Sequence, residues 1–149
     1  MSYIRTLLNC KTRNAITGKL LKSIRKKCPN IKKIDFIAVM GFSGVIPATY
    51  ISDALKIPIL IVRKNKESSH GDILESIRYP DDASFIIIDD GICTGSTITK
   101  ILRIIKKEYN WQCKAVFLYN QKSIKYWVYQ DKTIWKQMIS KWKFPVYVV

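Results

Sequence analysis

The sequence has few of the residues that build metal centres and covalent cross-links. It contains 4 Cys and 1 His in 149 residues, with only 6 Gly and 5 Pro. The cysteines form no C-x-x-C pair and a single histidine cannot complete a Cys/His cluster, so structural zinc is not expected. Scattered cysteines suit a reducing compartment, and we expect a cytoplasmic protein. These residues are Cys10, Cys28, Cys93, Cys113 and His70.

Long apolar segments are missing as well. No apolar run approaches the roughly 18 residues that a membrane span requires, and the start Met-Ser-Tyr-Ile-Arg has no apolar signal-peptide core. We therefore expect a soluble chain with no membrane partner. Apolar residues make up 48% and charged residues 25% of the sequence, which is typical of a globular protein. A length of 149 residues suits one domain, 1–149, with any site built inside one core.

Acidic residues are absent from the beginning of the chain. None precedes Asp35, and the whole sequence has 26 Lys and Arg against 11 Asp and Glu, a net charge of +15. Such an excess is typical of proteins that contact nucleic acid or another polyanion. The chain is also rich in Ile and Lys, as AT-rich codon usage would make it, so a charge without a partner is the competing interpretation. The early cations include Lys11, Arg13, Lys19, Lys22, Arg25, Lys26, Lys27, Lys32 and Lys33.

Apolar spacing predicts helices that alternate with buried strands. A helical repeat predicts a basic amphipathic helix over about 14–28, and the core is expected over about 35–119. Unbroken apolar runs that alternate with helices favour an α/β fold with a doubly wound, mainly parallel sheet. A glycine loop and a helix to about residue 55 should follow the first strand, and an aromatic tail occupies about 120–149. The predicted strands lie at about 35–40, 57–62, 85–88 and 113–119.

The segment 89–97 carries the strongest chemical signal. Asp89 and Asp90 follow an apolar strand, and a Thr-Gly-Ser-Thr turn then opens a helix. Backbone amides at a helix N-terminus can surround a phosphate, and carboxylates at the carboxyl end of a sheet suit the hydroxyls of a ribose. Taken alone, the segment also fits an ordinary turn followed by a helix cap.

The full string at 85–97, Phe-Ile-Ile-Ile-Asp-Asp-Gly-Ile-Cys-Thr-Gly-Ser-Thr, closely resembles the signature of the type I phosphoribosyltransferases. These enzymes use phosphoribosyl pyrophosphate (PRPP). The resemblance implies catalytic roles for Asp89 and Asp90, which are also candidate magnesium ligands, and a turn for the 5′-phosphate. That turn comprises Cys93, Thr94, Gly95, Ser96 and Thr97, with Cys93 expected as a small packed residue and not as a nucleophile.

Further residues fit the same family in the same order along the chain. The resemblance implies a pyrophosphate-binding turn after the first strand and cations after the second, and then a flexible catalytic loop. Its basic residue and His-Gly pair are similar to the orotate branch. The pyrophosphate group is Gly41, Phe42, Ser43, Gly44, Arg63 and Lys64, and the loop residues with expected catalytic roles are Lys64, Lys66 and His70.

The family resemblance implies transfer of the phosphoribosyl group to a nucleobase, with Mg²⁺ bound through PRPP, and a homodimer. A purine acceptor is slightly favoured because 126–135 resembles the small xanthine-guanine enzymes, where Trp127 and Trp135 could stack on a base. Cys93 departs from that branch, which has a general-base aspartate at this place. An orotate enzyme and a PRPP-binding regulator that binds nucleic acid through its basic N-terminal helix remain the alternatives.

Overall fold

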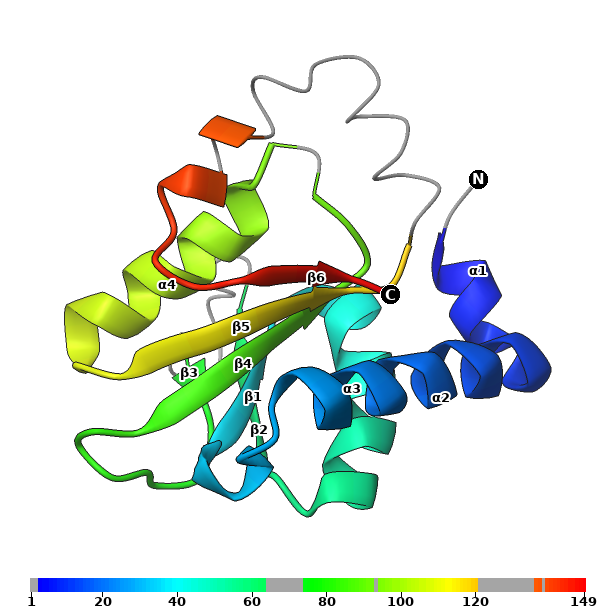
Figure 1. Cartoon of the computed structure of the whole chain (residues 1–149), viewed down its shortest axis with the longest axis horizontal. Helices are drawn as coiled ribbons and strands as arrows, with labels where there is room; N and C mark the ends of the chain where they lie inside the picture. The colour runs from blue at the N-terminus through cyan, green and yellow to red at the C-terminus, as the bar shows by residue number, and fades with distance from the viewer. Residues whose placement is uncertain (1–2, 64–73, 93, 121–135, 138) are drawn as a thin grey trace.

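The computed structural model describes residues 3–63, 74–92, 94–120, 136–137 and 139–149 (Figure 1). The chain begins with the helices α1 (Tyr3–Leu8) and α2 (Cys10–Lys27) and the 3₁₀ turn η1 (Ile31–Lys33). The strands and longer helices then alternate. In chain order they are β1 (Phe36–Val39), α3 (Gly41–Leu55), β2 (Ile59–Val62), β3 (Leu74–Glu75), β4 (Ser84–Asp89), α4 (Ser96–Glu108), β5 (Gln112–Leu118) and β6 (Val146–Val148).

One six-stranded sheet, in the order β3-β2-β1-β4-β5-β6, organises the fold. Every neighbouring pair is parallel except β2 and β3. The prediction of a doubly wound, mainly parallel α/β sheet is therefore confirmed. In the described part of the chain, no helix is long and apolar enough to cross a membrane.

Helices cover both faces of the sheet, as Figure 1 shows. On one face α4 inserts Ile98, Ile101 and Ile105 into a core with Phe36, Phe85 and other strand residues. On the other face α2 and α3 pack against Ile37, Ile86 and their neighbours. All four residues of β1 are buried. Burial on both faces explains why the central strands are unbroken apolar runs in the sequence.

Several boundaries differ from the sequence prediction. The basic helix starts at Cys10 and not near residue 14, because the side chain of Asn9 caps it by accepting from the Thr12 amide at 3.1 Å. The short α1, β3 and β6 were not predicted. Residues 146–148 of the predicted aromatic tail pair with β5, so this part of the tail extends the sheet.

The predicted glycine loop at 41–44 is wrong, because these residues form the first turn of α3. Gly41 has φ 73°, a left-handed conformation that favours glycine and lets the chain turn directly from strand into helix. A Cβ on Gly44 would lie 2.9 Å from the carbonyl oxygen of Ile88 and 3.0 Å from the Cβ of Val39. Glycine therefore allows α3 to begin in close contact with β1 and β4.

This close contact predicts the effect of a methyl group. Gly44→Ala should lower the free energy of unfolding by about 1–3 kcal/mol, since the group it meets on β4 is backbone and cannot move aside. Gly18→Ala in α2 is the control, because nothing lies within 4 Å of its added Cβ. That variant should gain about 0.5–1 kcal/mol from helix propensity. Urea denaturation measures both, and equal effects would contradict the proposed crowding.

Candidate active site

The site lies where the chain reverses its direction of travel across the sheet. From β1 the chain passes through α3 to β2 on one side, and from β4 it passes through α4 to β5 on the other. Because β1 and β4 are parallel neighbours, their carboxyl ends lie side by side. Ligands of open α/β sheets bind in the crevice at this switch point.

Two helix N-termini meet this crevice. The α3 helix begins directly after β1, and α4 begins shortly after β4. Gly41 and Gly95 both have positive φ, 73° and 72°, and neither N-cap residue, Met40 or Gly95, makes a side-chain capping bond. The first-turn amides of a helix have no acceptor within the helix. Both turns therefore present backbone donors and the positive end of a helix dipole to an anion.

The predicted acid pair lies between these two turns. Asp89 is the last residue of β4 and is only 4% exposed. Its Oδ1 accepts a hydrogen bond from the Ser43 hydroxyl at 3.2 Å and another from the Asp90 amide at 2.9 Å. The first of these bonds joins the acid pair to the predicted pyrophosphate turn. The structure thus brings together two groups that are far apart in the sequence.

The environment of Asp89 disfavours its charged form. Burial, and after it the neighbouring charge of Asp90, together raise the pKa of the Asp89 carboxyl from its ordinary value to about 7. The Ser43 hydroxyl and the Asp90 amide oppose this shift because they donate to the carboxylate. A bound cation or additional hydroxyl donors would stabilise the ionised pair. A buried carboxyl with a strongly shifted pKa in a crevice is typical of a functional site.

Tyr119 is a site residue that the sequence analysis missed. It follows β5, and its amide donates to the Asp89 carbonyl at 3.3 Å. Its hydroxyl donates to the carbonyl of Ser43 at 2.7 Å. Together with the Ser43–Asp89 bond, these contacts close a ring that joins the ends of β4 and β5 to the first turn of α3. No local motif marks Tyr119, because its partner is 76 residues away in the chain.

The predicted phosphate turn opens α4 as expected. Thr94 and Ser96 are exposed, and the Thr94 hydroxyl oxygen accepts from the Ser96 amide at 3.3 Å. Thr97 lies in the first turn of the helix, where backbone amides lack intrahelical acceptors. In the other turn the Phe42 side chain is 70% exposed, so its contribution to anion binding would come from its backbone amide.

Arg63 follows β2 at the same edge of the sheet, as predicted, but its guanidinium is paired. It forms a hydrogen-bonded ion pair with Glu75 of the neighbouring strand β3. A diphosphate would have to compete with this carboxylate for Arg63. The remaining predicted residues lie outside the described part of the chain: Lys64, Lys66, His70, Cys93, Trp127 and Trp135.

The donors available to a metal ion are carboxylate oxygens. Among the described residues there is no group of three or more His, Cys, Asp or Glu side chains that could hold a metal by themselves. Mg²⁺ commonly takes one or two carboxylates and completes its coordination with water and substrate phosphates. The adjacent carboxylates of Asp89 and Asp90, one of them destabilised by burial, fit that mode of binding.

Comparison with known proteins agrees with this geometry. The sequence profile of the phosphoribosyl transferase domain matches residues 5–147. An orotate phosphoribosyltransferase from Cutibacterium acnes (strain DSM 16379 / KPA171202) is 28% identical over 104 residues, which cover 69% of this chain and 46% of that protein. The chain thus spans about half the length of this curated relative.

Solved structures of two further enzymes share the fold. Adenine phosphoribosyltransferase from Saccharomyces cerevisiae superposes with a TM-score of 0.72 at 17% identity, covering 99% of this chain and 83% of that one. Orotate phosphoribosyltransferase from Francisella tularensis gives 0.69 at 16% identity, covering 95% and 66%. The profile match across nearly the whole chain, on a sheet of this topology with an acid pair at its switch point, makes the chain a member of the phosphoribosyl transferase domain family.

Proposed function

We propose that this protein transfers the 5-phosphoribosyl group of PRPP to a ring nitrogen of a nucleobase and releases pyrophosphate. The observation that carries the proposal is the placement of Asp89 and Asp90 between the N-termini of α3 and α4, whose N-cap residues make no side-chain capping bond. Such an arrangement offers acceptors for sugar hydroxyls in the middle and amide donors for a phosphate on each side. PRPP has this distribution of groups, with a phosphate at C5′, a diphosphate at C1′ and hydroxyls between them.

Each part of the site has a proposed task in the reaction. The turn at 94–97 holds the 5′-phosphate, and residues 41–44 hold the diphosphate. The C1′–O bond to pyrophosphate breaks as the C1′–N bond to the base forms, through a ribooxocarbenium-like transition state. Fixed amides that stabilise the departing negative charge lower this barrier without reorganisation. Bound Mg²⁺ would supply further charge neutralisation on the diphosphate, with Asp89 and Asp90 as its protein ligands or as partners of the ribose hydroxyls.

The acceptor base is proposed at the level of class. A purine is the first candidate and orotate the second, and the predicted stacking residues Trp127 and Trp135 belong to this part of the proposal. Pyrophosphate release from PRPP and Mg²⁺ with adenine, guanine, hypoxanthine, xanthine or orotate distinguishes these acceptors. We also propose that the protein is a cytoplasmic homodimer. Analytical ultracentrifugation of the full chain tests the dimer.

The acid pair provides the first test of the chemistry. Asp89→Asn combined with Asp90→Asn should reduce turnover by at least about a hundredfold, because the amides cannot stabilise a cation or the developing positive charge of the sugar. Asp81→Asn combined with Asp82→Asn is a matched control, since that exposed pair precedes the same strand at its opposite end. Near-normal turnover in the first variant, or equal losses in both, would contradict the proposal.

The raised pKa of Asp89 predicts a pH dependence of stability in metal-free buffer. Between the ordinary carboxyl value of 3.8 and about 7 the folded protein binds the extra proton, so the contribution of Asp89 to stability falls as pH rises through this window. Asp89→Asn removes that contribution. The variant should gain stability relative to wild type from pH 4 to pH 7, by up to a few kcal/mol, since one pKa unit corresponds to about 1.4 kcal/mol. Urea denaturation measures the free energy of unfolding of both proteins at each pH. A difference between them that does not change from pH 4 to pH 7 would contradict the assignment.

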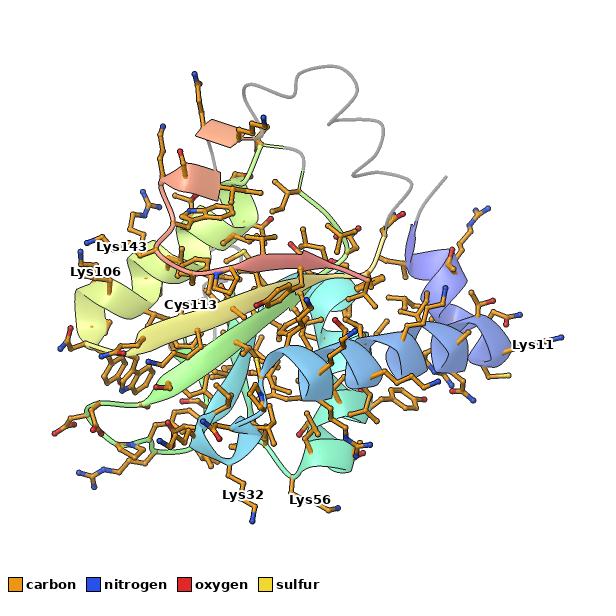
Figure 2. All side chains as sticks on the ribbon, in the orientation of Figure 1. Lys11, Lys32, Lys56, Lys106, Cys113 and Lys143 are labelled. Carbon is orange, nitrogen blue, oxygen red and sulfur yellow. The ribbon has the colours of Figure 1, made fainter. Side chains whose placement is uncertain are left out.

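A second candidate function is supported by the outer face of α2. Its exposed charged residues are all cations, and at about 1.5 Å per residue they follow the helix for roughly 22 Å from Lys11 to Lys26. Neither ion pair found among the described residues involves α2. Figure 2 shows Lys11 at one end of this helix and Lys32 beyond the other, while Lys106 lies across the molecule on α4. This face suits a nucleic-acid backbone, as a PRPP-binding regulator would require.

Charge reversal on α2 tests this candidate. Lys19→Glu, Lys22→Glu and Lys26→Glu together should weaken binding to a labelled RNA or DNA oligonucleotide about tenfold or more at low salt and reduce its salt dependence. Arg103→Glu, Lys106→Glu and Lys107→Glu on α4 make the same change of charge at exposed residues on the other side of the sheet. Equal weakening in both variants would indicate non-specific electrostatic attraction and contradict a nucleic-acid site on α2. If the wild-type protein bound anionic lipid vesicles but no oligonucleotide, the partner of this face would be a membrane surface and not nucleic acid.

A further inference from the structure

The proline within α3 leaves a backbone acceptor unmatched by the helix itself. In an α-helix the carbonyl of residue 43 accepts from the amide of residue 47. Residue 47 is Pro47, which has no amide hydrogen, and it is buried inside the helix. The carbonyl of Ser43, a half-buried residue, therefore lacks its intrahelical donor, and a donor from elsewhere in the chain reduces the cost of that loss.

Tyr119 supplies that donor. Its hydroxyl lies 2.7 Å from the Ser43 carbonyl oxygen, which is a strong hydrogen-bond distance. The Tyr119 ring is partly buried against the core on the α2–α3 side of the sheet, so the hydroxyl is held in place by packing. Burial, together with the charges of Asp90 and Asp89, raises the pKa of the Tyr119 hydroxyl above its usual range, and the group therefore remains a donor.

The same residue is fixed to the acid pair through its backbone. The Tyr119 amide donates to the Asp89 carbonyl, and the hydroxyl of Ser43 donates to the Asp89 carboxylate. Because of Pro47, one hydrogen bond within α3 is missing. Tyr119, the residue after β5, donates to the same carbonyl instead and so links α3 to the end of β5. In a helix with an amide at position 47, the carbonyl of Ser43 would already have one donor, and the bond from Tyr119 would matter less to it.

We propose that Tyr119 is a positioning residue, which replaces the missing amide of Pro47 and thereby holds residues 41–44 in register with Asp89. Resting on the proposed function, this gives Tyr119 the task of setting the distance between the diphosphate turn and the groups that contact the ribose. Tyr119 does not itself need to touch the substrate. Its removal should therefore affect PRPP more than the base, since the turn at 41–44 faces only the diphosphate in the proposed complex.

Tyr119→Phe removes the hydroxyl and keeps the packed ring. We expect kcat/KM for PRPP to fall about tenfold while KM for the base changes less than about twofold, because an error in alignment is expressed mainly in the transition state. The midpoint of thermal unfolding should fall by roughly 2–4 °C. Tyr79→Phe is the matched control, since its hydroxyl also donates to a carbonyl, that of Ile59, at the opposite end of the sheet. It should leave the PRPP kinetics unchanged.

Pro47→Ala separates positioning from simple satisfaction of the carbonyl. In the double variant with Tyr119→Phe, the new amide at position 47 can donate to Ser43, so the thermal midpoint should recover relative to Tyr119→Phe alone. The loss in kcat/KM should persist, because the bond to β5 is still missing. Recovery of the kinetics, or wild-type kinetics in Tyr119→Phe, would overturn the positioning role. Independent effects of the two changes on thermal stability would overturn the replacement of the amide by the hydroxyl.

A separate measurement distinguishes failure of the proposed function from failure of the positioning role of Tyr119. If wild-type protein turns over none of the bases tested, the proposed function fails. Binding of Mg²⁺-pyrophosphate, measured by calorimetry, then decides the role of Tyr119 by itself. Weaker binding in Tyr119→Phe than in Tyr79→Phe supports it, and equal binding or no binding to wild type overturns it.

Discussion

The burial of one carboxylate is the constraint on which the rest of this site depends. Asp89 ends a strand that is covered on both faces, and it is only 4% exposed. A charge in that position is stable only where donors or a cation surround it. The Ser43 hydroxyl and the Asp90 amide provide part of this environment. A cation or hydroxyl groups of a bound ligand would add to this environment and favour the ionised form of the carboxyl.

The two helices beside Asp89 are positioned by glycine in two different ways. Gly41 and Gly95 have left-handed backbone angles, which turn the chain from the sheet into each helix. Gly44 is required for space, since a side chain there would meet the carbonyl of Ile88. Glycine therefore serves two purposes here, a left-handed backbone conformation and close packing. The close packing at Gly44 brings the first turn of α3 against the end of β4. Gly41 and Gly44 are also the reason why the sequence pattern predicts a loop at 41–44.

The features that sequence could predict are those encoded locally. Apolar runs followed by charged or glycine-rich turns identified the four central strands and the α/β sheet, and they placed Asp89 and Asp90 at the end of a strand. The two- and three-residue strands β3 and β6 have too little pattern of their own and are defined by pairing with neighbours. The contact between Tyr119 and Ser43 also depends on strand order, which places the end of β5 beside the end of β4. A missing amide at Pro47 is visible in the sequence, but its replacement donor is not.

Stability and ligand binding make opposite demands on this edge of the sheet. The folded protein alone would be more stable with a neutral group at position 89, because burial and Asp90 both disfavour the charge there. A ligand with hydroxyl groups, or one that carries a divalent cation, would instead stabilise the ionised form of Asp89. The contacts from Ser43 and Tyr119 hold the carboxylate and the α3 turn in place before the ligand arrives, so that binding energy is not spent on ordering them. A hydrogen-bonded backbone around a buried carboxylate with a raised pKa is therefore consistent with the proposed binding of PRPP at this edge of the sheet.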